Sequence, residues 1–127
     1  MRQPKTVLLV DDDAFCVFLA EAVLKKAGVE AEILRASHGR EALAVIREAC
    51  LRASCPELVL LDLHMPVMGG LAFLEELQEC ADVDCAAMRV VILSSSLHGV
   101  ELAGPNSLPL VGCIEKPLTV GKLAGFL

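Results

Sequence analysis

The chain has 127 residues, a net charge of −6 and 55% hydrophobic residues, among them four Phe but no Trp or Tyr. This length suits one domain and leaves no room for a second. The net negative charge argues against a nucleic-acid surface, which needs clustered Lys and Arg, and the few aromatic rings argue against stacking on bases. The high hydrophobic content with few aromatic residues predicts an aliphatic core.

The chain opens with an apolar run that ends in three aspartates. Residues 6–10 contain β-branched side chains and predict a buried strand ending at Asp11. Residues 14–27 predict a helix, with Asp13 as its N-cap and Gly28 as its terminator. The apolar residues that recur at helical spacing are Phe15, Phe18, Leu19, Ala22 and Val23.

A weaker strand and a second helix follow. Residues 31–36 have mixed polarity, which is typical of a strand at the edge of a sheet. Residues 39–53 predict a helix that Pro56 keeps from extending further. The apolar positions of this helix are Ala42, Leu43 and Ile46.

Residues 58–62 form the central stretch of the sequence. They are an apolar run too short to span a membrane, and Pro66 and two glycines follow them, which predicts a buried parallel strand leading into a loop. Asp62 then lies at the carboxyl end of that strand, where ligands bind in open α/β sheets. Capping of the next helix is the alternative role for Asp62 that this stretch alone leaves open.

The second half of the chain continues the alternation of strands and helices. It predicts a third helix after Gly70, a fourth strand over 88–94, a short or irregular helix within 97–103, a fifth strand over 110–115 and a last helix from about Thr119. Strands that alternate with helices imply right-handed crossovers and a parallel sheet covered on both faces.

Cysteine usage and the absence of targeting signals suggest a reducing compartment. There is no C-x-x-C pair, and the three histidines lack the spacing of a zinc site. With no N-terminal signal pattern and no apolar stretch near ~20 residues, we expect a cytoplasmic protein without a membrane span. We therefore expect the thiols to stay free. The cysteines are Cys16, Cys50, Cys55, Cys80, Cys85 and Cys113.

The predicted carboxyl ends of the strands gather a set of polar side chains. They are Asp11, Asp12 and Asp13 after the first strand, Asp62 in the third, Ser94 in the fourth and Lys116 after the fifth. Crowded carboxylates repel one another unless a cation compensates, and an all-oxygen set suits Mg²⁺. A hydroxyl and an ammonium group beside them suit a phosphoryl group. With no triad histidine visible, the set predicts in-line phosphoryl transfer to a carboxylate.

These motifs, in this order, strongly resemble the receiver (CheY-like) domains of two-component response regulators along essentially the whole chain. They are Val10 to Asp13, Asp62 followed by Met65-Pro66 and Gly70, Ser94-Ser95, and Lys116-Pro117. The resemblance implies a single receiver domain over residues 1–127. It also implies an α/β fold, the flavodoxin-like (βα)5 three-layer sandwich, with a parallel five-stranded sheet of order 2-1-3-4-5.

The resemblance also implies a metal and a phosphorylation chemistry. Asp62 would be the phospho-acceptor in a Mg²⁺-dependent reaction with a sensor histidine kinase or a His phosphotransfer protein. Asp12, Asp62 and the backbone carbonyl of His64 would ligate Mg²⁺, and Asp11 would hold it mainly through water. Lys116 would pair with the carboxylate and then with its phosphate.

The resemblance further implies how the signal is produced. Ser94 would be the switch hydroxyl, and Asp13 would only cap a helix. The chain would be a cytoplasmic phosphoprotein of a phosphorelay, not an enzyme, although it would assist its own phosphotransfer and dephosphorylation. Besides the phosphodonor it would bind an unidentified downstream protein, but no nucleic acid and no membrane, as a monomer or weak dimer.

Several positions depart from the usual receiver pattern. Receivers usually have Asp where this chain has Gly69, and many have an aromatic switch residue where it has Cys113. The irregular segment 97–103 and the end at Leu127 also differ, at the face through which receivers usually signal. Phosphorylation is therefore better supported than any particular output.

Other functions remain open. Asp11-x-Asp13 after an apolar strand also fits the nucleophile motif of haloacid-dehalogenase-type phosphatases, but no Asp follows Asp84 and no acidic pair follows Lys116. A receiver-like interaction module that is never phosphorylated is the non-enzymatic alternative, against which the complete acidic set argues. A flavin site is less supported, because three carboxylates would repel a cofactor phosphate.

Overall fold

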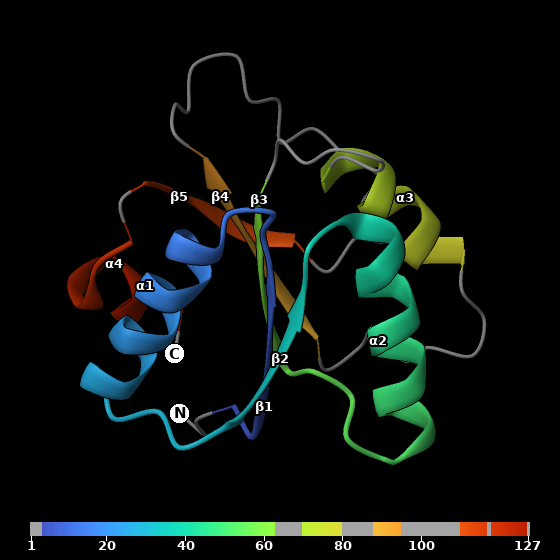
Figure 1. Ribbon diagram of the computed structural model, residues 1–127, viewed down its shortest axis with the longest axis horizontal. Coiled ribbons are helices and arrows are strands. Elements are labelled where there is room, and N and C mark those ends of the chain that lie inside the picture. Colours follow the sequence, from blue (N-terminus) through green and yellow to red (C-terminus); the bar gives the residue numbers. More distant parts are fainter. Residues whose placement is uncertain (1–3, 63–69, 80–87, 95–109, 117, 127) are drawn as a thin grey trace.

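The computed structural model describes residues 4–62, 70–79, 88–94, 110–116 and 118–126. Their elements lie within one or two residues of the predicted bounds (Figure 1), and the helix predicted within 97–103 falls outside the described residues. In chain order they are β1 (Thr6–Val10), α1 (Ala14–Lys26), β2 (Glu32–Ala36), α2 (Gly39–Leu51), β3 (Leu58–Asp62), α3 (Gly70–Glu79), β4 (Arg89–Ser94), β5 (Leu110–Glu115) and α4 (Val120–Ala124).

The five strands form one parallel sheet of order β2-β1-β3-β4-β5, which confirms the predicted topology. β2 lies at an edge, as its mixed polarity predicted. The register pairs Val10 with Leu61, Leu61 with Ile92, and Ser94 with Glu115. The carboxyl ends of the strands therefore share one edge of the sheet. In Figure 1, α1 and α4 cover one face and α2 and α3 the other.

Two apolar cores lie on the two faces of the sheet. One includes Ile46 from α2 and Phe73 from α3, and the other includes Leu24 from α1 and Leu123 from α4. Successive residues of β1 contribute alternately to the two cores. Burial on both faces explains why β1 and β3 are nearly continuous apolar runs.

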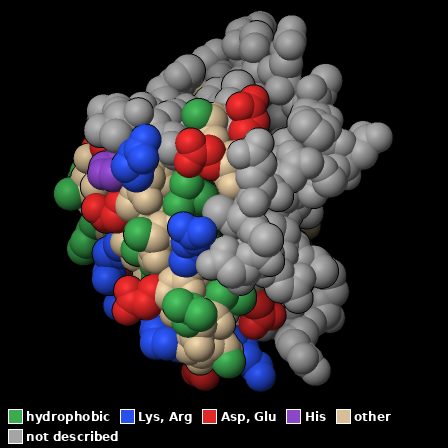
Figure 2. Space-filling model, turned by 90° about the vertical axis from the view of Figure 1, so that its right-hand side faces the viewer, with side chains coloured by type: hydrophobic (Ala, Val, Ile, Leu, Met, Phe, Trp, Pro, Cys, Tyr) green, Lys and Arg blue, Asp and Glu red, His purple; other side chains and the backbone are tan. Residues whose placement is uncertain are grey.

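α2 has an apolar side and a charged side. It buries Ala42 and Ile46, two of the apolar positions predicted for it, and Leu43 is partly buried. Figure 2 shows positive and negative side chains interspersed over this side of the molecule. Among the described residues, no helix is both long and apolar enough to cross a membrane.

α1 begins and ends as predicted, but it buries only Val23 of the five apolar positions predicted for it. The Asp13 side chain caps it by accepting the Phe15 N–H at 2.9 Å, and Gly28 follows it with φ 81°. Phe15 and Phe18, part of the predicted apolar stripe, are 68% and 69% exposed. The spacing alone was ambiguous, since apolar residues occur on nearly every side of α1. The residues that it buries are Ala20, Val23 and Leu24.

The expectation that all thiols are free is wrong for Cys50 and Cys55, which form a disulfide. α2 ends at Leu51 and the chain reverses through Ala53, whose φ of 58° is left-handed. This reversal brings residue 55 back to the last turn of α2, a contact that no sequence spacing indicated. Of the described cysteines, Cys16 and Cys113 are free thiols.

Candidate functional site

Three carboxylates meet where β1 and β3 end. Asp11 and Asp62 are 8% and 7% exposed, whereas Asp12 is exposed. One oxygen of each lies within 4.8 Å of the others. Asp11 is held in place because its Oδ1 accepts the backbone N–H of Asp13 at 3.0 Å. The structure thus brings together the three carboxylates that the sequence selected as metal ligands.

Asp13 does not join this cluster. Its Oδ1 accepts the Phe15 N–H at 2.9 Å, and its Oδ2 accepts a weak hydrogen bond from the Cys16 thiol at 3.6 Å. Both oxygens therefore serve the first turn of α1, which is the capping role predicted for Asp13.

Lys116 places an ammonium group against two of the carboxylates. Its Nζ lies 3.0 Å from Asp11 Oδ2 and 3.7 Å from Asp62 Oδ1. Its backbone N–H donates to the Ser94 carbonyl at 2.7 Å, which extends the β4–β5 ladder as far as Lys116. Burial lowers the pKa of Lys116, but the hydrogen bond to Asp11 and the two negative charges raise it more. Lys116 therefore keeps its proton at neutral pH.

Ser94 lies deep in the sheet beside this cluster. It is 1% exposed at the end of β4, and Leu93, the residue before it, pairs in register with Asp62. Cys113, which stands where many receivers have an aromatic residue, packs against the core beneath α2 and α3. His64, whose carbonyl was predicted to ligate Mg²⁺, lies outside the described residues.

Cys16 is a contact of the site that the sequence reasoning did not identify. Its Sγ lies 3.8 Å from Lys116 Nζ. Burial raises the pKa of this thiol, and Asp11 and Asp13 raise it further against the opposing charge of Lys116, so the thiol is neutral at pH 7. Its place three residues after Asp13, one turn along the helix, indicated that Cys16 lies beside Asp13 but not that it reaches Lys116.

The charges of the described site do not balance. Three carboxylates face one ammonium group, which leaves an excess of two negative charges. A divalent cation would cancel this excess, and a hard, all-oxygen ligand set suits Mg²⁺. The donor set therefore fits Mg²⁺.

Comparisons with known proteins agree with this geometry. A family model described as the response regulator receiver domain matches residues 7–126. Over 122 residues the chain is 32% identical to the autoinducer 1 sensor kinase/phosphatase LuxN of Vibrio campbellii. That match covers 96% of this chain but only 13% of LuxN, so the chain corresponds to a small part of that protein.

Two solved structures are also similar. A two-component response regulator from Cytophaga hutchinsonii superimposes with a TM-score of 0.83 at 24% identity, over 98% of this chain and 94% of that one. The Mn²⁺-bound form of response regulator Rcp1 has a TM-score of 0.71 at 26% identity, over 97% and 88%. The chain belongs to the family of response regulator receiver domains, which are signalling domains phosphorylated on an aspartate.

Proposed function

We propose that this receiver domain accepts a phosphoryl group on Asp62 from a sensor histidine kinase or a His phosphotransfer protein. The observation that carries the proposal is the setting of Asp62. This carboxylate is 7% exposed at the end of β3, with the Lys116 ammonium nitrogen 3.7 Å from its Oδ1. Asp11 is less suited to attack, because the Asp13 N–H and Lys116 engage one oxygen each.

The proposed reaction is an in-line displacement. An oxygen of Asp62 attacks the phosphorus of a phosphohistidine, the O–P bond forms as the P–N bond breaks, and the imidazole nitrogen takes up a proton. Lys116, protonated beside Asp62, is placed to neutralise charge on the transferred group. No general base is needed, because a carboxylate nucleophile attacks as its anion and has no proton to give up.

Asp11, Asp12 and Asp62 would hold Mg²⁺, which supplies positive charge to the phosphoryl oxygens when it is bound. The excess of carboxylates over ammonium groups supports this assignment. So does the solved relative Rcp1, which was obtained in a Mn²⁺-bound form. The His64 carbonyl is proposed as a further ligand on the resemblance alone.

Ser94 would be the switch hydroxyl. It is 1% exposed and lies one residue beyond the β4 partner of Asp62, so a phosphoryl group on Asp62 comes close to it. A hydrogen bond to a charged acceptor contributes about 1.5–3 kcal/mol, enough to bias a two-state loop by one to two decades. The signal would then reach an unidentified downstream protein through the segment after β4.

The exposed rings of α1 suit the docking of the phosphodonor. Phe15 and Phe18 are about two-thirds exposed, on the helix that starts directly after the aspartates of β1. A protein that brings a phosphohistidine to Asp62 must cover this corner and would bury both rings. Phe18→Ser should therefore slow transfer from a phosphorylated kinase while leaving loading from acetyl phosphate unchanged, and equal slowing of both would refute the docking role.

The alternatives are less well supported. A haloacid-dehalogenase-type phosphatase would need Asp13 as an acid in the site, but Asp13 caps α1 with both oxygens. A module that is never phosphorylated would not need a cluster of three carboxylates, two of them paired with a lysine.

Acetyl phosphate with Mg²⁺, followed by intact mass measurement, tests the proposal. We expect one added phosphate on the wild-type chain and none on Asp62→Asn. Asp13→Asn is the matched control, because Asn caps a helix as well as Asp, and it should load normally. Loading of Asp62→Asn at the wild-type level would reject Asp62 as the acceptor, and steady turnover of phosphate esters would favour the phosphatase.

We further propose one receiver domain over residues 1–127 that acts as a monomer or weak dimer in the cytoplasm, without binding nucleic acid or membrane. The match of the family model over residues 7–126 supports the single domain. The disulfide between Cys50 and Cys55 counts against a reducing compartment, where such bonds are rare. Size-exclusion chromatography tests the oligomeric state, and thiol counting in freshly lysed cells tests the redox state of Cys50 and Cys55.

A further inference from the structure

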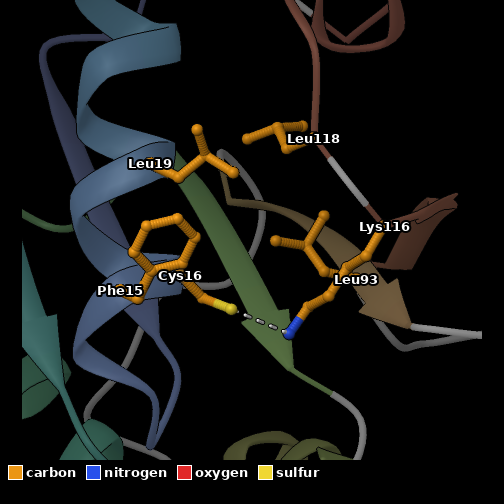
Figure 3. A pocket seen from close by; sticks show the side chains of 6 residues that line it. All are labelled: Phe15, Cys16, Leu19, Leu93, Lys116 and Leu118. Carbon is orange, nitrogen blue, oxygen red and sulfur yellow. Dashed lines mark hydrogen bonds between the residues drawn. The ribbon is translucent and has the colours of Figure 1, made fainter.

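A cavity of about 310 Å³ lies beside the candidate site, between α1 and the ends of β4 and β5. Figure 3 shows side chains from α1 on one side of it and Leu93, Lys116 and Leu118 on the other. Its volume is at the lower end of the range for small-molecule pockets, roughly 300–1,000 Å³. The described residues that line it are Phe15, Cys16, Leu19, Leu93, Lys116 and Leu118.

Nearly all of the lining by described residues is apolar, and its polar side-chain atoms are at one place. They are Lys116 Nζ and Cys16 Sγ, 3.8 Å apart (Figure 3). Lys116 Nζ donates a hydrogen bond to Asp11 Oδ2 at 3.0 Å and a weak one to Cys16 Sγ, and it forms an ion pair with Asp62 Oδ1 at 3.7 Å. Because sulfur is a weak acceptor, an oxygen atom of a ligand would accept a hydrogen bond from Lys116 better than Cys16 does.

The charges near the cavity restrict which ligand can enter. An anion bound to Lys116 would also lie close to Asp11 and Asp62. The two carboxylates would repel it, because their two negative charges exceed the one positive charge of Lys116. A cation would have to leave water for walls made of Leu and Phe side chains. A neutral molecule meets neither cost.

We propose that this cavity binds a small, neutral, mostly apolar molecule with one oxygen acceptor, such as a short ketone or alcohol, which accepts a hydrogen bond from Lys116. Occupancy changes the rate of phosphorylation, since Lys116 faces Asp62 and Leu93 precedes Ser94. The effect on the phosphorylation rate rests on the proposed function, whereas binding of the small molecule does not.

Three probes of the same heavy-atom count test the binding. They are acetophenone, which has a carbonyl oxygen, the hydrocarbon isopropylbenzene, and the anion benzoate. We expect saturable amide shifts at Cys16, Leu19 and Leu118 with acetophenone, about fivefold weaker binding of the hydrocarbon, and no binding of benzoate. Nuclear Overhauser contacts from the acetophenone methyl to Leu93 and Leu118 should locate it. Absence of these contacts, or stronger binding of benzoate, overturns the proposal.

Two variants with the same chemical change provide the control. Leu19→Phe fills the cavity from α1 and should weaken acetophenone binding at least about tenfold, whereas Leu51→Phe, at an 82% exposed position, should not change it. Should Leu19→Phe fail to fold, the Overhauser contacts in the wild-type chain decide the matter. Loading with acetyl phosphate at saturating acetophenone then tests the coupling. An unchanged rate despite demonstrated binding refutes the coupling alone, while an unphosphorylated wild-type chain refutes the proposed function.

Discussion

The two edges of the sheet, at the carboxyl and the amino ends of its strands, differ in the contacts that hold them. The carboxyl edge holds charged groups in contact, because Lys116 Nζ lies within 4 Å of an oxygen of the buried Asp11 and of the buried Asp62. At the amino edge, the chain reverses after α1 and α2 through backbone hydrogen bonds and a disulfide. The candidate site and the chain reversals thus lie at opposite edges of the sheet, so each should be alterable without the other.

The largest effect should come from removing the lysine of the carboxyl edge. Lys116→Met leaves two buried carboxylates without their ammonium partner and removes the positive charge next to Asp62. We expect the rate of loading from acetyl phosphate, followed by intact mass, to fall at least about tenfold.

Lys122→Met is the matched control for that substitution. Lys122 is exposed and donates to the Glu115 carbonyl at 2.9 Å. Its loss should leave loading at the wild-type rate. A Lys116→Met chain that loads as fast as the control would show that the ion pairs have no role in the chemistry.

The next largest effect should lie at the amino edge. Replacing both Cys50 and Cys55 by Ser removes a cross-link that closes a short loop, which should lower the free energy of unfolding by about 2 kcal/mol. Urea denaturation measures this change, and loading of Asp62 should stay as in wild type. If reductant leaves the wild-type denaturation midpoint unmoved, the cross-link does not stabilise the protein.

A metal effect should separate two neighbouring aspartates at the carboxyl edge. Asp12 belongs to the carboxylate cluster, while Asp13 caps α1. Mg²⁺ should raise the melting temperature of the wild-type chain by mass action. Asp12→Ala should abolish this gain, whereas Asp13→Ala should keep it but lose about 1 kcal/mol of stability with the cap. A full Mg²⁺ response in Asp12→Ala would place the metal elsewhere.

The carboxyl edge was the more predictable of the two from sequence. Strands buried on both faces are short apolar runs, so their ends could be located, and a parallel sheet must bring those ends together. Asp11, Asp62 and Lys116 were identified in this way. The Cys16 contact was not, because it depends on how α1 is rotated about its axis.

The rotation of α1 and the disulfide were both missed because neither is signalled by a residue type or a spacing in the sequence. The apolar residues of α1 occur on nearly every side, so the exposure of Phe15 and Phe18 followed from packing and not from periodicity. The pairing of Cys50 with Cys55 followed from the left-handed residue Ala53, and Ala is not a residue type that signals such a turn.

The smallest effects come from two helix ends that use the same motif with different residues. After α1 and after α2, two backbone N–H groups fold back onto the last turn in the Schellman pattern, with Gly28 at φ 81° in one and Ala53 at φ 58° in the other. The bonds are Gly28 N to Lys25 O at 3.0 Å, Val29 N to Leu24 O at 3.0 Å, Ala53 N to Cys50 O at 3.0 Å and Ser54 N to Ala49 O at 2.8 Å.

Gly28→Ala should lower the free energy of unfolding, and Ala53→Gly should raise it by a similar amount. A Cβ at Gly28 meets no atom within 4 Å, so Gly28→Ala costs only the left-handed backbone, about 1 kcal/mol. Ala53→Gly should recover about 0.5–1 kcal/mol, reduced by the greater freedom of Gly in the unfolded chain. Because the two turns are separate sites, urea denaturation of the double variant should give nearly wild-type stability. A double variant as unstable as Gly28→Ala alone would mean that Ala53 is not strained.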